Sequence, residues 1–225
     1  MEFGIFNLMG SRDPDKPAAQ VFGEVAEQTR LADELGYTIA WFAEHHFSNY
    51  CLCASPLMMV AHCAAITKKI KLGTAVVVLP LYNPARLAAE VATADAMSGG
   101  RLMLGIGAGY QPYEFERFGV DIAQNFTMTD EFCQILDRAL TQDFFSYEGK
   151  HYRIAQTHIP VRSVQNPAGR KLDRASIANM VEAEADAGGP TDREGMTAAA
   201  CELADRTQTH TWTPALTGPI VQRAN

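Results

Sequence analysis

The residues best suited to chemistry are an acid followed by two histidines, Glu44, His45 and His46. They come directly after the apolar run 37–42, which reads Tyr-Thr-Ile-Ala-Trp-Phe. A short run of this kind is typical of a buried parallel strand, and catalytic groups gather at the carboxyl ends of such strands. The histidines are therefore expected to lie where a ligand binds.

The two histidines are expected to differ in role. Side chains that are adjacent along an extended segment point in opposite directions, so one imidazole faces a ligand while the other packs or hydrogen-bonds structurally. An imidazole titrates near neutral pH and can both accept and return a proton. For either histidine alone, a structural role is the more common one.

A glycine cluster, Gly105, Gly107 and Gly109, follows another expected strand. A dinucleotide fingerprint has the pattern G-x-G-x-x-G and opens a helix directly after the first strand. Here Tyr110 follows the third glycine, and the cluster comes after the fourth strand. A dinucleotide site is thus disfavoured, although a glycine-lined loop still lets a flat ligand approach the backbone.

The five cysteines include the pair Cys51 and Cys53, close to the histidines. Structural zinc sites usually combine C-x(2–4)-C with a second ligand pair, and none follows. We expect reduced thiols in a loop and no metal site.

Strand and helix patterns alternate along the first three-quarters of the chain. Expected strands cover 2–8, 37–43, 69–79 and 101–106, expected helices cover 18–36, 56–68, 84–97 and 129–144, a polar-aromatic loop follows the glycine cluster, and 145–154 is expected to be a hairpin. Four consecutive βα units predict an α/β fold, half of a TIM-barrel-like (β/α)8 fold. A complete barrel takes about 250 residues, so the barrel is expected to be incomplete.

The pattern changes near Pro167. Residues 1–167 form the partial barrel, while residues 168–225 form an atypical tail that lacks Phe and Tyr and does not repeat the apolar strands. In this tail, 176–187 and 194–206 are expected to be helices or, with equal weight, disordered. The tail is not expected to supply four more barrel strands.

Composition excludes several classes of function. The 225 residues are 47% hydrophobic and 20% charged, with a net charge of -7, which suits a globular protein and opposes a nucleic-acid surface. Neither a signal peptide nor an apolar run long enough to span a membrane is found, so we expect no membrane contact and a cytoplasmic location.

Taken together, these motifs resemble those of the bacterial luciferase-like, flavin-dependent monooxygenases. The Glu-His-His-Phe motif and the stretch Gly73-Thr74-Ala75-Val76 are the most specific matches. The resemblance covers about residues 1–167, in family order, over the stretches 3–6, 43–47, 72–80, 83–86, 90–95, 98–101, 105–109, 114–119 and 147–152.

The resemblance implies a barrel that binds reduced FMN, supplied by a separate flavin reductase, at the strand carboxyl ends. Reduced flavin would react with O2 to give a C4a-peroxyflavin that oxygenates a small organic substrate. His45 matches the histidine expected to manage the proton. The peptide between Ala75 and Val76 is expected to be cis and to lie against the flavin, with Gly107 and Ala108 as further cofactor-binding positions.

Luciferase α subunits carry cysteine and arginine where this chain has Gly107 and Ala108, which argues against aldehyde-driven light emission. The family's remaining phosphate-binding groups belong to the second half of the barrel. Glu90, Asp95 and Arg101 are interpreted as structural residues.

Two alternatives stay open beside the monooxygenase. One is a truncated, non-catalytic relative whose half barrel leaves open sheet edges. The other is an oxidoreductase using the deazaflavin F420 for hydride transfer. A homo- or hetero-oligomer is compatible with each of these functions.

Overall fold

A parallel sheet forms the centre of the computed structural model, which describes residues 3–165 and 177–179. The strands pair in the order β1-β2-β3-β5, with β4 and β8 also pairing with β5, and every pair is parallel. Their bounds are β1 Gly4–Asn7, β2 Ile39–Phe42, β3 Lys71–Thr74, β4 Val77–Val78, β5 Leu102–Gly107 and β8 Ile177–Asn179. The four expected βα units are thus present, and the α/β class is confirmed.

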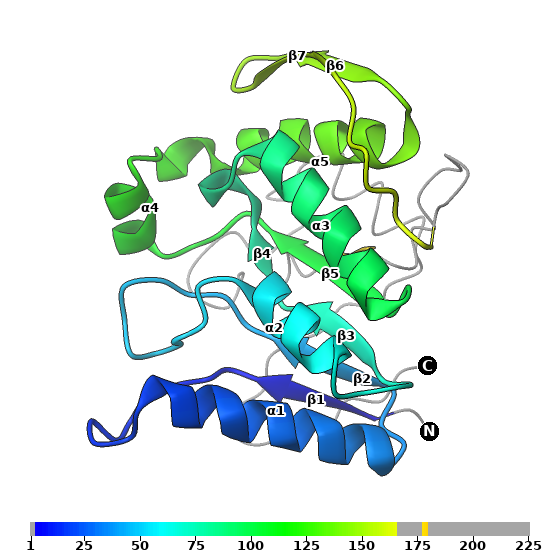
Figure 1. Ribbon diagram of the computed structural model, residues 1–225. Helices are drawn as coiled ribbons and strands as arrows, with labels where there is room; N and C mark the ends of the chain where they lie inside the picture. The colour runs from blue at the N-terminus through cyan, green and yellow to red at the C-terminus, as the bar shows by residue number, and fades with distance from the viewer. Residues whose placement is uncertain (1–2, 166–176, 180–225) are drawn as a thin grey trace.

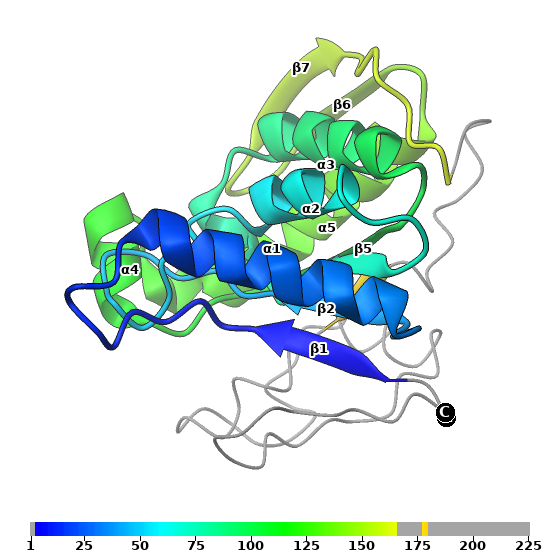
Figure 2. The same cartoon turned by 60° about the horizontal axis from the view of Figure 1, so that its bottom comes forward.

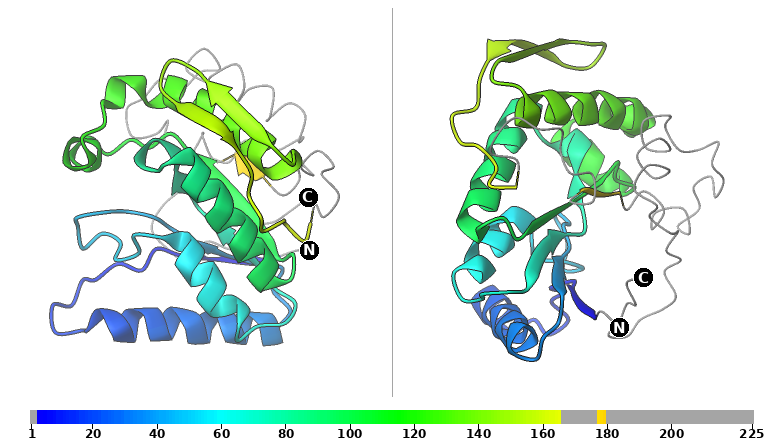
Figure 3. Two further views of the ribbon diagram at one scale, coloured as in Figure 1. Left: turned by 45° about the horizontal axis from the view of Figure 1, so that its top comes forward. Right: turned by 90° about the vertical axis from the view of Figure 1, so that its right-hand side faces the viewer.

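Helices connect successive strands and lie along one side of the sheet (Figure 1; Figure 3, right). After β5 come α4, η2, α5 and the antiparallel hairpin β6–β7. The hairpin lies beside α5 at one end of the molecule (Figure 1; Figure 2). The bounds are α1 Ala18–Glu34, α2 Pro56–Ala64, η1 Leu79–Leu81, α3 Pro84–Ser98, α4 Pro112–Phe118, η2 Ile122–Gln124, α5 Asn125–Thr141, β6 Phe145–Glu148 and β7 Arg153–Thr157.

Local sequence sets where α3 begins and ends. The side chain of Asn83 caps the helix by accepting a hydrogen bond from the Arg86 amide, and Pro84 occupies the first turn, where no amide donor is needed. The helix stops at Gly99, whose φ of 63° is left-handed. The chain is thereby turned back toward β5.

The expected third strand, 69–79, is not continuous. β3 ends at Thr74, the Ala75–Val76 peptide is cis, and β4 is followed directly by a 3-10 turn, η1. At the break, the Thr74 hydroxyl donates to the Gly105 carbonyl and accepts from the Gly105 amide, at 2.7 and 2.9 Å. A side chain thus replaces the backbone partner that a regular strand would supply, which apolar patterning alone does not indicate. The cis peptide itself is as expected.

The expected helix bounds were wrong in several details, including the end of α2, which comes at Ala64 and not at 68. Part of the expected polar-aromatic loop is the helix α4, because the buried side chains of Glu114 and Phe115 anchor it. α5 begins at Asn125, four residues before the expected start at 129. The side-chain Nδ2 of Asn125 donates to the Gly109 carbonyl at 2.8 Å, a contact that only the fold creates.

One further strand comes from the segment assigned to the tail. Ile177–Asn179 is β8, parallel to β5 with Leu104 opposite Ile177, rather than the start of a helix over 176–187. Three residues are too few for periodicity to identify, and the open edge of β5 supplies the backbone partners. The rest of the tail, with the helix or disorder expected at 194–206, lies outside the described residues.

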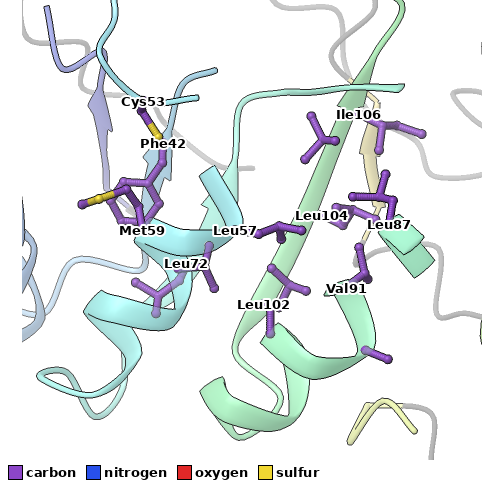
Figure 4. Packing of buried hydrophobic residues seen from close by; sticks show 14 of the residues in the cluster. Phe42, Cys53, Leu57, Met59, Leu72, Leu87, Val91, Leu102, Leu104 and Ile106 are labelled. Carbon is purple, nitrogen blue, oxygen red and sulfur yellow. The ribbon is translucent and has the colours of Figure 1, made fainter. Parts of the chain in front are cut away.

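The core fills the space between the sheet and the helices. Its best-buried members include Phe42 and Leu72 from the strands and Leu87 from α3, each 0% exposed (Figure 4). Burying one such side chain stabilises the fold by about 1.5–3 kcal/mol. The core holds the strand ends, and therefore the loops that follow them, in fixed positions.

Arg101 and Asp95 are structural, as expected. The Arg101 guanidinium donates to the carbonyl oxygens of Ala64, Ile70 and Ser98, and so ties together α2, α3 and the residue just before β3. Asp95 accepts from Ser163 and Gln165, and Glu90 pairs with Arg86 along α3.

In the part of the chain that the structure describes, the helices are too short or too polar to cross a membrane.

Candidate active site

The predicted site residues lie at the carboxyl ends of β2, β3 and β5. His45 follows β2, whose last residue, Phe42, accepts a 2.8 Å hydrogen bond from the Ala75 amide. Val78 lies opposite Gly107 in the register of β4 and β5. The His45 ring lies 6.0 Å from that of Tyr110, which ends the glycine cluster. Three stretches that are far apart in sequence thus form one region.

His45 is held through one ring nitrogen. Its Nδ1 lies 3.1 Å from Oε1 of Glu114, and its ring makes an edge contact with Tyr50, with centroids 4.9 Å apart. Nε2 makes no hydrogen bond to another described residue. The side chain is 12% exposed, so this imidazole is held firmly but is not sealed off.

Glu114 is the buried carboxylate that fixes this part of the site. The same Oε1 accepts the backbone N–H of His46 at 2.8 Å and the Tyr113 hydroxyl at 3.4 Å. Burial acts to raise the pKa of Glu114, but the hydrogen bonds from His45 and His46 outweigh it and leave the pKa below its ordinary value. The group is therefore ionised at neutral pH.

His46 takes a different acid. Its Nε2 lies 2.9 Å from Oε1 of Glu44, while the ring packs edge-on against Phe118 at 4.8 Å. Oε2 of Glu44 accepts from the Tyr82 hydroxyl at 2.9 Å and from the Val78 amide at 3.3 Å. Glu44 therefore ties the histidine motif to β4.

Burial raises the pKa of Glu44 above its ordinary value, despite the hydrogen bonds from His46, Tyr82 and Val78. Both donors on Oε2 leave that oxygen as an acceptor, so any proton that Glu44 holds lies between Oε1 and the His46 ring. The two neighbouring histidines are thus bound at opposite ring nitrogens by two different carboxylates.

The four positions expected to contact a cofactor differ in exposure. Ala75 and Val76 are partly exposed, between the buried Thr74 and Val77. Gly107 and Ala108 are buried, Ala108 being 1% exposed. The described structure thus leaves the cis peptide more accessible than the glycine loop.

Gly109 has to be glycine. Its φ is 78°, and a Cβ there would lie 2.5 Å from Cγ1 of Val78 and 2.7 Å from the Phe115 ring. The sharp, closely packed turn brings α4 back over the strand ends, and so places Glu114 against the histidines.

The cysteines near the motif lie in the loop and support the backbone. The carbonyl of Cys53 accepts the His45 amide at 3.1 Å, and Cys51 is buried next to the Ala43 carbonyl. Burial raises the pKa of Cys51 to about 11 and that of Cys53 to about 12, so both are thiols at neutral pH. Across the described residues, no group of three or more His, Cys, Asp or Glu side chains is arranged to hold a metal ion.

The sequence singled out His45 but neither its partner Glu114 nor Tyr82, the partner of Glu44. Glu114 and Tyr82 lie 69 and 38 positions from the residues they contact. The available signal for Glu114 was its place in the matching stretch 114–119. An acid on a helix that follows a glycine loop is otherwise an ordinary surface residue.

Comparison with known proteins decides the family. The family model described as luciferase-like monooxygenase matches residues 1–208. The chain belongs to this family. The match extends beyond the 1–167 expected from motifs and includes β8.

Two curated relatives show how the similarity is distributed. An uncharacterized protein of Sinorhizobium fredii, y4vJ, is 48% identical over 74% of this chain and 48% of its own length. The oxygenase component of the flavin-dependent trigonelline monooxygenase of Acinetobacter baylyi is 30% identical over 74% of this chain and 47% of its own. The chain thus spans about half the length of these relatives.

Solved structures agree on the fold. Monooxygenase RslO1 from Streptomyces bottropensis is 26% identical with a TM-score of 0.74, over 94% of this chain and 68% of its own. The oxygenating constituent of 3,6-diketocamphane monooxygenase from Pseudomonas putida, in complex with FMN, is 26% identical with a TM-score of 0.70, over 80% and 51%. The F420-dependent tetrahydromethanopterin reductase of Methanopyrus kandleri is 26% identical with a TM-score of 0.58, over 73% and 47%.

Proposed function

We propose that this protein is the oxygenase of a flavin-dependent monooxygenase, which uses reduced FMN and O2 to oxygenate a small organic substrate. A separate flavin reductase supplies the reduced FMN. His45 is the residue that accepts and returns the proton during oxygenation.

The observation that carries the proposal is how the His45 side chain is held and where it lies. It is held at Nδ1 by a buried, ionised Glu114, remains 12% exposed, and stands at the carboxyl ends of the strands. In α/β folds of this kind the chemistry is located at these ends. The FMN complex of the diketocamphane enzyme, which shares the fold, supports FMN as the cofactor.

The residues present fit a flat aromatic ring. Ala75 and Val76 are small and partly exposed, and the aromatic side chains of Tyr50 and Tyr110 lie against the His45 ring. When bound, reduced flavin supplies the electrons for the reaction with O2. This chain contributes the contact surface, the exclusion of water and the imidazole.

Use of F420 for hydride transfer is the second candidate. It is supported by the shared fold and 26% identity with the F420-dependent reductase. A non-catalytic role, the other alternative that the sequence left open, is the third.

Flavin binding and oxidation separate the three candidates. The full chain is titrated with FMN and with F420, and the reduced FMN complex is then mixed with O2 while flavin absorbance and O2 uptake are followed. The wild type should bind FMN and reoxidise it with a time course unlike that of free flavin. A general acid–base group typically contributes about 10²–10⁴-fold, so His45→Gln should bind FMN but shift this rate by at least tenfold.

His62→Gln is the matched control, because His62 is exposed in the last turn of α2, which leads to the amino end of β3 and not to the carboxyl ends where the site lies. It should leave both the binding and the time course unchanged. F420 binding without FMN binding would favour the second candidate. Binding of neither cofactor would favour the third.

A further inference from the structure

The two carboxylates of the site engage different nitrogens of the two histidines. Glu44 contacts Nε2 of His46, whereas Glu114 contacts Nδ1 of His45. A neutral imidazole has one N–H and one acceptor nitrogen, and the partner at one nitrogen decides the state of the other. The choice of nitrogen therefore determines what each ring offers to a ligand.

Oε1 of Glu114 acts only as an acceptor. The backbone N–H of His46 can only donate, and it reaches this oxygen at 2.8 Å, with the Tyr113 hydroxyl at 3.4 Å. The carboxylate is ionised, since its pKa lies below the ordinary value once the bonds from the histidines are made. An ionised carboxylate has no proton to give, so the hydrogen in the contact to His45 is on Nδ1.

The arrangement is held in place by packing. Glu114 is 2% exposed and the next residue, Phe115, is 1% exposed, so the short helix α4 is anchored from within. The left-handed turn at Gly109 leads the chain into this helix. The carboxylate cannot leave His45 without also breaking its bond to the His46 amide, because the same Oε1 makes both contacts.

We propose that Glu114 is the positioning residue that keeps neutral His45 as its Nδ1–H tautomer, which leaves Nε2 as the proton acceptor of the site. The inference rests on the proposed function in one respect only, namely that His45 is the group that handles the proton. The tautomer itself is a property of the protein without flavin.

Nitrogen NMR of histidine-labelled full-length protein, without flavin, tests the tautomer directly. The protein has six histidines, and the signals of His45 are assigned by their loss in His45→Gln. Spectra are recorded at about pH 8.5, well above the ordinary imidazole pKa of about 6.5. The wild type should show a protonated Nδ1 and an unprotonated Nε2 for His45.

Two variants of Glu114 separate positioning from general support. Glu114→Gln keeps a carbonyl oxygen that can accept from both Nδ1 and the His46 amide, so it should keep the tautomer. Glu114→Ala removes the acceptor, and the His45 signals should move toward the tautomer mixture of a free imidazole. Glu116→Ala is the control, because Glu116 is exposed on the same helix, and it should match the wild type.

A protonated Nε2 in the wild type would overturn the proposal, as would an unchanged His45 spectrum in a folded Glu114→Ala. If Glu114→Ala does not fold, the wild type and Glu114→Gln still decide, since both must show the protonated Nδ1. Failure of FMN binding would refute the proposed function and leave the tautomer result standing.

Discussion

At the scale of single residues, the site depends on two buried carboxylates whose pKa values are shifted in opposite directions. Glu114 receives several donors on one oxygen and has a lowered pKa, whereas desolvation dominates at Glu44 and raises its pKa. Neighbouring groups with pKa values pushed apart are a common feature of active sites. Here each acid orients one histidine of the same motif.

Glu44→Gln tests the raised pKa. When the pKa of a carboxyl is higher in the folded state than its unfolded value of about 4.3, the protein loses stability as the pH rises from the unfolded pKa through the folded pKa. The side-chain amide of Gln does not titrate, so it adds no such loss. From pH 5 to pH 8, Glu44→Gln should therefore gain free energy of unfolding relative to the wild type, as measured by urea denaturation. A relative loss over the same range would contradict this account.

Glu44→Ala is the matched variant. It leaves the Val78 amide and the Tyr82 hydroxyl without their acceptor and opens a cavity, so it should cost about 2–4 kcal/mol at pH 5, and less at pH 8 because it too lacks the titrating carboxyl. A cost below about 1 kcal/mol at pH 5 would mean that these donors have found other partners.

At the scale of elements, the turns after the strands place the side chains. The break after Thr74 separates β3 from β4, and the left-handed Gly109 leads into α4. The side chains that could take part in catalysis lie on these connections, while the strands and helices beneath them are packed and rigid.

Gly109→Ala tests how tightly the connection from β5 to α4 is packed. A side chain at φ 78° is strained, and its Cβ would clash with Val78 and Phe115. Together these effects should lower the free energy of unfolding by about 2–5 kcal/mol.

Gly119→Ala is the control for the strain alone. Its φ is 71°, but a Cβ there meets no described atom within 4 Å, so it should cost only about 1–2 kcal/mol. Equal costs for the two variants, measured by urea denaturation, would show that close packing at Gly109 is unimportant.

At the scale of the whole molecule, the described structure is built on one parallel sheet with helices along one side, and the chain spans about half the length of the curated relatives it matches. Long-range polar contacts join successive βα units. The clearest is Asp33 at the end of α1, whose carboxylate accepts the backbone N–H groups of Lys68, Lys69 and Ile70, just before β3.

Asp33→Asn should weaken the whole fold in a pH-dependent way. Burial acts to raise the pKa of Asp33, but the three backbone donors lower it below its ordinary value. The ionised group therefore stabilises the fold above an unfolded pKa of about 3.9, and this contribution is lost as pH falls through the folded pKa.

At pH 7 the variant should lose about 1–3 kcal/mol of unfolding free energy, and the difference from the wild type should narrow below about pH 4. Asp15→Asn, at an exposed position, is the control and should stay within about 0.5 kcal/mol of the wild type. A difference that is constant from pH 7 to pH 3 would refute the role of ionisation.

Much of this protein follows from its sequence alone. The βα units are indicated by periodicity and capping residues, which act over a few neighbouring positions, while the family and the cis peptide at Ala75–Val76 are implied by the resemblance that short motifs carry. Because these patterns are local, they did not predict the break after β3, the helix α4 or the strand β8, each of which depends on contacts with distant parts of the chain.

Only the tertiary structure decided which acid serves which histidine. Glu114 reaches His45 across 69 positions, and Tyr82 reaches Glu44 across 38. These pairings depend on the register of neighbouring strands and on the turn at Gly109, which bring distant loops to one edge of the sheet. No spacing along the chain encodes that geometry, so the state of the His45 ring could be inferred only from the fold.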